Sequence, residues 1–175
     1  DVCPDMYGVE YSQIDWFSGV FIPWINNLPF KHAWSKVIFV PGNHDNKYRY
    51  PNAVVRSAII KGIKDSDEVD DKLLPICMET QQDFWDFYTR LTEEKQQPSV
   101  SFSRNVQLDE NHQISFVLYN TSVFLEEKES DGFCLIPENK FISIEEVVPS
   151  MQQIVVTLFH HNPCWIDAQT QRNNR

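Results

Sequence analysis

Three side chains that bind metals or transfer protons stand together after an apolar run: Asn43, His44 and Asp45 follow residues 37–40 and a Pro-Gly turn. An asparagine oxygen can ligate a metal ion, and a histidine can donate a proton to a leaving group or stabilise a pentacoordinate phosphorus. A carboxylate beside an imidazole is a usual device for fixing its tautomer. These residue types indicate metal-assisted acid–base chemistry.

A second apolar run, IVVTLF, leads directly into His160 and His161, and Pro163 closes the turn that follows. A histidine of this loop offers an imidazole nitrogen and Asn43 offers a neutral oxygen, a pair that suits Mn²⁺, Fe or Zn²⁺. In open α/β sheets, ligand sites lie just outside the carboxyl ends of the strands. We therefore expect the two loops to face a shared crevice.

Alternating strands and helices must position these side chains. Short runs rich in β-branched and aromatic residues predict strands, at 37–40, 99–104, 114–124 and 153–159. Helical spacing of apolar residues and capping residues predict helices, at 12–28 with a kink or end at Pro23, from Asn52, at 80–94, and behind Ser143. The alternation favours an α/β architecture with a largely buried sheet over an all-β sandwich.

Composition narrows the class of protein. The 175 residues carry a formal net charge of −10, which argues against a broad electrostatic grip on nucleic acid or on an anionic membrane. No apolar run approaches the roughly 18–20 residues of a membrane span, and the first residues lack the pattern of a signal peptide, so we expect a cytoplasmic protein without a membrane. The four cysteines are far apart and predict separate reduced thiols.

The two loops resemble signatures of a known family. VIFVPGNHD at 37–45 resembles the third signature of the calcineurin-like metallophosphoesterase superfamily, and IVVTLFHHNP at 154–163 resembles the fourth. ISFVLYNTS at 114–122 is similar to the family's strand that ends in a small polar turn. The resemblance implies a sandwich of mixed β-sheets flanked by helices. It implies one domain over 1–175, partial at both ends, with an insertion at about 46–113.

The resemblance also implies roles for individual residues. Asn43 and His160 would be metal ligands, His44 the catalytic histidine near the phosphoryl group, and Asp45 the residue that orients it. His161 would be second shell or would face the substrate.

An upstream aspartate is expected to bridge two divalent metal ions, which would be Mn, Fe or Zn. Asp5 stands 38 positions before Asn43 and is the candidate, although Pro4 replaces the family's glycine. Asp1, or neither aspartate, is the alternative. The family's D-x-H and G-H-x-H signatures are absent from the 175 residues, so we expect further domains of a longer chain.

The function implied is metal-dependent hydrolysis of a phosphoester, by a phosphodiesterase, nuclease or phosphatase. Tyr48, Arg49 and Tyr50 could stack on a base and grip a phosphate, or could only pack against the insertion. Nucleic acid and a small phosphodiester therefore both stay open as substrates. The alternative is a catalytically silent module of the same fold that serves protein interaction or regulation.

Overall fold

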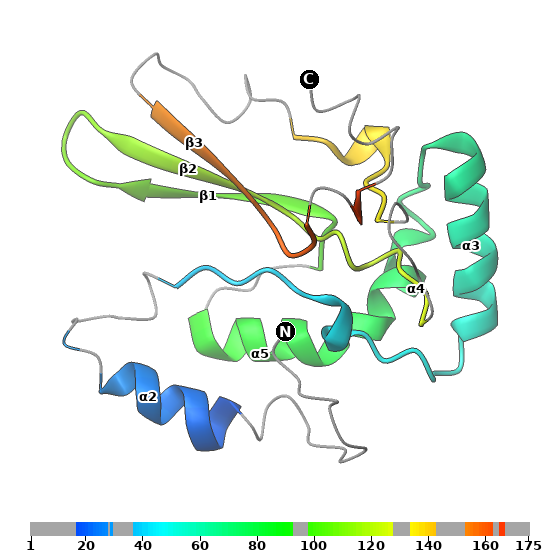
Figure 1. The fold of residues 1–175 in the computed structure, drawn as a ribbon, viewed down its shortest axis with the longest axis horizontal. Coiled ribbons are helices and arrows are strands. Elements are labelled where there is room, and N and C mark those ends of the chain that lie inside the picture. Colours follow the sequence, from blue (N-terminus) through cyan, green and yellow to red (C-terminus); the bar gives the residue numbers. More distant parts are fainter. Residues whose placement is uncertain are drawn as a thin grey trace.

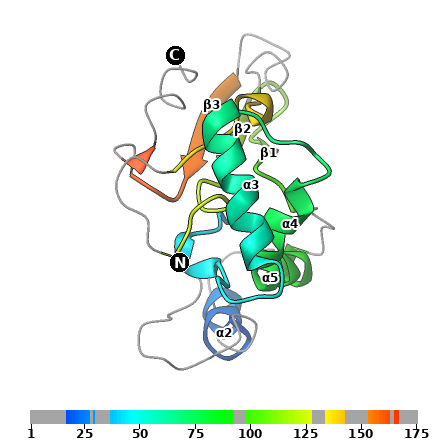
Figure 2. The ribbon, with the colours of Figure 1, turned by 90° about the vertical axis from the view of Figure 1, so that its right-hand side faces the viewer.

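The computed structural model describes residues 17–27, 29, 37–92, 98–127, 134–142, 153–162 and 165–166. Figure 1 shows these residues as a sheet that lies above helix α5 (Gln82–Thr92), with helix α2 (Ile22–Asn26) on the far side of α5. Helix α3 (Ala53–Ser66) stands beside the sheet and faces the viewer in Figure 2. The chain is a mixed α/β protein, as the alternation of elements predicted.

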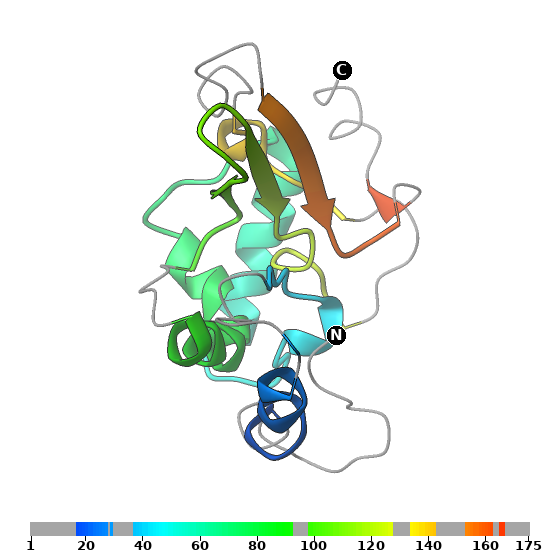
Figure 3. The same ribbon diagram turned by 90° about the vertical axis from the view of Figure 1, so that its left-hand side faces the viewer.

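Among the described residues the sheet has three strands, in the order β1 (Ser101–Gln107), β2 (Gln113–Tyr119) and β3 (Gln153–Phe159). β1 and β2 form an antiparallel hairpin, whereas β2 and β3 are parallel, with Tyr119 opposite Phe159. Figure 3 shows the arrows of β2 and β3 pointing the same way. The turns that follow these two strands therefore leave the same edge of the sheet.

Proline chemistry explains the start of α2, whereas neither α2 nor α3 begins with a side-chain capping hydrogen bond. A π-helical turn at Phe17–Phe21 leads into α2, and Pro23 lies in the first turn of α2, where its missing N–H leaves no hydrogen bond unmade. α3 begins after Asn52, as predicted. The short α4 (Leu74–Met78) and the 3₁₀ turn Glu79–Gln81 lead into α5. The predicted helix behind Ser143 lies outside the described residues.

Side chains of β2 alternate between two hydrophobic clusters, so helices cover both faces of the sheet. Val117 and Tyr119 pack with Ile60 and Ile63 of α3. Leu118 packs with the aromatic face of α5 and with two further aromatic residues, in the cluster Phe39, Phe84, Trp85, Phe87, Tyr88 and Phe102. The aromatic residues of α5 therefore belong to the core.

The predicted strand at 37–40 is wrong. These residues run as an extended segment outside the sheet that the described residues form. Phe39 packs edge-on against Phe87 of α5, with ring centroids 5.4 Å apart, and Arg104 of β1 donates to the carbonyl oxygen of Val37 at 3.0 Å. A short apolar run predicts burial, but a strand also needs a neighbouring strand that pairs with its backbone, and none of the three described strands pairs with this segment.

No helix in the described part of the chain is both long enough and apolar enough to cross a membrane. The described cysteines, Cys77 and Cys134, are buried and free, in agreement with the expectation of separate thiols.

Candidate active site

A 3₁₀ turn at Asn43–Asp45 carries the first group of predicted site residues. Asp45 is buried, and its carboxylate oxygen Oδ2 accepts a hydrogen bond from the backbone N–H of Gly42 at 2.7 Å. The N–H of Asp45 donates to the carbonyl oxygen of Gly42 at 3.1 Å. Asp45 thus closes the turn on itself, while His44 is exposed to solvent. The orientation of His44 by Asp45 stays a prediction.

Asn43 and His160 meet at this turn, although 117 positions separate them in the chain. The Nε2 atom of His160 lies 3.2 Å from Oδ1 of Asn43. Two ligands bound to one metal ion, each about 2.1 Å from it, lie about 3 Å apart at octahedral angles. Burial is the main cause that lowers the pKa of His160, and it favours the neutral imidazole that binds metals.

The donors that the structure describes fit part of a metal shell. One amide oxygen and one imidazole nitrogen suit Mn, Fe or Zn, and both are held on turns that the fold positions. In the described part of the chain, no cluster of three or more His, Cys, Asp or Glu residues could hold an ion. The predicted bridging ligand Asp5 and its alternative Asp1 lie outside the described residues.

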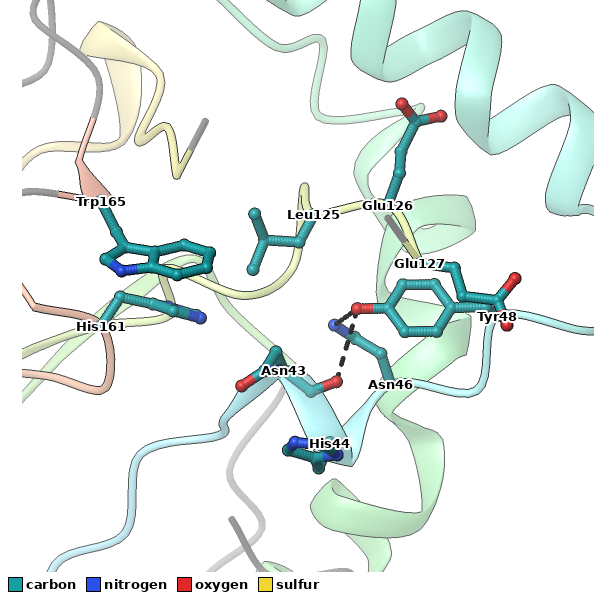
Figure 4. A pocket seen from close by; sticks show the side chains of 9 residues that line it. All are labelled: Asn43, His44, Asn46, Tyr48, Leu125, Glu126, Glu127, His161 and Trp165. Carbon is teal, nitrogen blue, oxygen red and sulfur yellow. Dashed lines mark hydrogen bonds between the residues drawn. The ribbon is translucent and has the colours of Figure 1, made fainter. Parts of the chain in front are cut away.

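A cavity of about 360 Å³ opens beside this pair (Figure 4). Its lining comes from three segments that are far apart in the sequence: Asn43, His44, Asn46, Tyr48, Leu125, Glu126, Glu127, His161 and Trp165. Figure 4 shows Trp165 and His161 on one side of the cavity and Tyr48 on the other, with Asn43 and His44 between them. The predicted ligand Asn43 and the predicted catalytic histidine therefore border one cavity.

His161 is held by a hydrogen bond that the sequence did not predict. Its Nδ1 atom lies 2.7 Å from the hydroxyl oxygen of Thr121, and its side chain is only 8% exposed. Its Nε2 atom is buried and has no hydrogen-bond partner among the residues that the structure describes. Burial, and secondarily the neighbouring His160, lowers the pKa of His161 to about 4. The imidazole is therefore neutral at pH 7.

A buried polar network joins the 43–45 turn to the turn that follows β2. Asn46 donates through Nδ2 to the carbonyl oxygen of Ser122 at 2.8 Å, and the hydroxyl of Ser122 lies 3.1 Å from the carbonyl oxygen of Pro41. Behind them, Gln81 donates to the Ser122 hydroxyl oxygen at 2.8 Å, and Asn120 donates to Gln81 Oε1 at 2.6 Å. These bonds satisfy buried polar groups and hold both turns in place.

Arg56 of α3 supports the cavity from behind. It is 3% exposed, and its Nη2 atom donates to the carbonyl oxygens of Val123 and Leu125. Its guanidinium lies 5.8 Å from the centre of the Tyr48 ring. Arg56 therefore holds in place two sides of the cavity, one formed by Tyr48 and the other by Leu125.

The three candidate substrate-contacting residues 48–50 take different positions in the structure. Tyr48 lines the cavity, and its hydroxyl donates to the carbonyl oxygen of Asn43 at 3.4 Å. Tyr50 turns away, and its hydroxyl donates to the carbonyl oxygen of Ile76 at 3.1 Å. This contact corresponds to the alternative in which the residue only packs against the insertion. Arg49 is exposed and is not among the residues lining this cavity.

Sequence reasoning missed five residues of the lining, namely Asn46, Leu125, Glu126, Glu127 and Trp165. The sequence contained a signal for two groups of these residues. Trp165 stands two positions after the HHNP motif, and residues 125–127 follow the polar turn NTS. Residues that follow strand ends in a parallel pair border the same edge, so both segments were candidates.

Comparisons of the chain with known protein families, with curated proteins and with solved structures found no match. The resemblance to the metallophosphoesterases therefore stays a prediction that depends on the GNHD and HHNP motifs.

Proposed function

We propose that this chain is a metal-dependent hydrolase of phosphoesters with a calcineurin-like fold. The observation that supports the proposal is the approach of Asn43 Oδ1 and His160 Nε2 to 3.2 Å, next to a cavity that His44 borders. These are the residues to which the two sequence motifs assign metal binding and catalysis. Residues of this kind that are distant in sequence meet in space when they share a task.

The described side chains have distinct tasks in this proposal. Asn43 and His160 would hold one of two divalent ions, whose Lewis acidity would polarise the phosphoryl group and an attacking water. Asp45 keeps the turn that carries Asn43 and His44 closed, through its hydrogen bond with the backbone N–H of Gly42. His44 is exposed at the cavity and can donate a proton to the leaving oxygen.

The size and the charged border of the cavity favour a small phosphoester, rather than a nucleic-acid duplex, as the substrate. Its volume of about 360 Å³ lies at the lower end of the range for sites of small molecules. Glu126 and Glu127 lie at its border, and carboxylates repel a polyanionic strand. Arg49, the predicted phosphate contact for a nuclease, lies outside this lining.

Metal content and turnover test the proposal together. The purified protein is supplemented with Mn²⁺, Fe²⁺ or Zn²⁺, dialysed, analysed for bound metal, and assayed with bis(p-nitrophenyl) phosphate and p-nitrophenyl phosphate. We expect bound metal and hydrolysis of at least one of the two esters. Near-zero metal after supplementation together with no hydrolysis would overturn the proposal and favour the silent interaction module.

A further inference from the structure

One buried polar atom at the cavity is not accounted for by metal binding or by proton transfer. Nε2 of His161 is buried and lacks a hydrogen-bond partner in the described part of the chain, and the residue as a whole is 8% exposed. Buried nitrogen atoms are nearly always hydrogen-bonded, because an unmade bond costs stability. His161 lines the cavity, and Figure 4 shows its ring directed from beneath Trp165 toward the space above Asn43. A bound ligand would supply the missing partner.

Thr121 determines which hydrogen-bonding role this nitrogen has. Thr121 is 1% exposed, and its hydroxyl lies 2.7 Å from Nδ1 of His161. When the hydroxyl donates its proton to Nδ1, the ring proton of a neutral imidazole lies on Nε2. Nε2 then presents an N–H donor to the cavity. A donor of this kind recognises an oxygen atom, and it binds a charged oxygen more strongly than a neutral one.

The position of the donor indicates which oxygen it meets. The same cavity is bordered by Asn43, the proposed metal ligand, and by His44, the proposed proton donor. A phosphoryl group bound between them has oxygen atoms that point to the remaining wall, which His161 forms. The parallel pairing of β2 and β3 places Thr121 and His161 two residues after the paired residues Tyr119 and Phe159, so the contact is built by the sheet.

We propose that His161, oriented by Thr121, donates a hydrogen bond from Nε2 to a phosphoryl oxygen of a small phosphoester bound in this cavity. The assignment rests on the proposed function for the identity of the ligand. It adds a substrate-binding residue and a positioning residue, Thr121, which neither sequence motif contains. It also gives the HHNP loop a second task beside metal binding through His160.

A pair of variants at Thr121 tests the proposal. Thr121→Val removes the hydroxyl and nearly keeps the shape, whereas Thr121→Ser keeps the hydroxyl. Inorganic phosphate is titrated into the metal-supplemented wild type and both variants by isothermal titration calorimetry. We expect Thr121→Val to weaken phosphate binding by about tenfold and Thr121→Ser to stay within about twofold of the wild type. With a hydrolysed ester, Thr121→Val should raise KM more than it lowers kcat.

A second measurement needs no variant. The ¹⁵N chemical shifts of the His161 ring in the wild type report its tautomer, and phosphate should shift the Nε2–H resonance. An Nδ1–H tautomer, phosphate binding that is equal in wild type and Thr121→Val, or no phosphate binding up to about 10 mM would each overturn the assignment. Hydrolysis with unchanged phosphate binding in Thr121→Val would overturn the assignment alone. Phosphate binding that depends on Thr121, without metal or hydrolysis, would overturn the proposed function alone.

Discussion

His160 Nε2 and Asn43 Oδ1 lie 3.2 Å apart, one on the turn after β3 and the other on the 3₁₀ turn after the extended segment 37–40. The two side chains are within hydrogen-bond distance of each other and at the spacing of two ligands that share an ion. The same contact can therefore hold the turns together before a metal binds and reorganise little when it does.

Asn43→Ala and His160→Ala should each lower the affinity for Mn²⁺ or Zn²⁺ by at least about tenfold, because each removes a proposed ligand. Bound metal after equilibrium dialysis, measured by plasma mass spectrometry, checks this. Asn105→Ala, at an exposed position of β1, is the matched control and should bind metal as the wild type does. Wild-type metal content in both site variants would exclude this pair from the metal centre.

His44→Ala should reduce kcat by about 10²–10⁴-fold and leave metal content near that of the wild type, because His44 is a proposed proton donor. Steady-state kinetics with bis(p-nitrophenyl) phosphate, together with metal analysis of the same samples, measure both effects. His112→Ala, an exposed histidine in the β1–β2 hairpin, should change neither quantity. Full activity of His44→Ala would remove this residue from the mechanism.

Gln81→Ala should destabilise the fold by about 1–3 kcal/mol, because it removes a buried amide that donates to the Ser122 hydroxyl and accepts from Asn120. Urea unfolding followed by fluorescence measures the change. The neighbouring Gln82 is exposed and its amide donates to Asp86 on the surface of α5, so Gln82→Ala should cost less than about 0.5 kcal/mol. Equal effects of the two substitutions would contradict the structural role of the buried network.

Arg56→Met should destabilise the fold by about 2–4 kcal/mol, because two buried carbonyl oxygens lose their donor. The loss should also weaken phosphate binding, since Arg56 holds the segment that carries Leu125. Lys61→Met, at an exposed position of the same helix, is the control for loss of a positive charge on α3. A stability of Arg56→Met equal to that of Lys61→Met would show that the guanidinium does not support this wall.

Stability should fall between pH 7 and pH 5 in the presence of EDTA. The pKa of His161 is about 4 in the folded protein and near 6.5 in the unfolded chain, so between these values the unfolded chain binds more protons. The free energy of unfolding therefore decreases as the pH falls below 6.5, by on the order of 1 kcal/mol at pH 5. Urea titrations at both pH values measure this. His161→Gln should show a smaller decrease, and an unchanged decrease would contradict the buried neutral state of His161.

Local patterns predicted most of the elements. The predicted strand at 114–124 overlaps β2 but continues five residues past its end at Tyr119, the strand at 153–159 coincides with β3, and the helix at 80–94 contains α5. These predictions succeeded because spacing of apolar residues reports which face of an element is buried. The prediction of a strand at 37–40 failed, because apolar spacing reports burial but does not report strand pairing. Its apolar residues are buried by α5, but strand formation depends on a partner that the segment itself does not specify.

Thr80 shows a similar limit at the level of one side chain. Its position before α5 predicted a cap, yet its hydroxyl donates to Asn46 Oδ1 at 3.0 Å and lies 3.1 Å from the carbonyl oxygen of Cys77. A hydroxyl at the start of a helix can serve the helix or a tertiary contact. The hydroxyl of Thr80 bonds to the buried amide oxygen of Asn46, because an unpaired buried acceptor costs more free energy than a helix end that lacks a cap and is exposed to water.

The sequence by itself determined which side chains are available for chemistry, because the GNHD motif places Asn43, His44 and Asp45 on one short turn and the HHNP motif places two histidines after an apolar strand. It could not show that Thr121 orients His161 or that Leu125 and Trp165 border one cavity. Those contacts depend on the parallel pairing of β2 with β3 and on the support of Arg56, which join segments far apart in the chain. Side-chain type and local spacing are properties of neighbouring residues, whereas a cavity is a property of surfaces that only tertiary packing brings together.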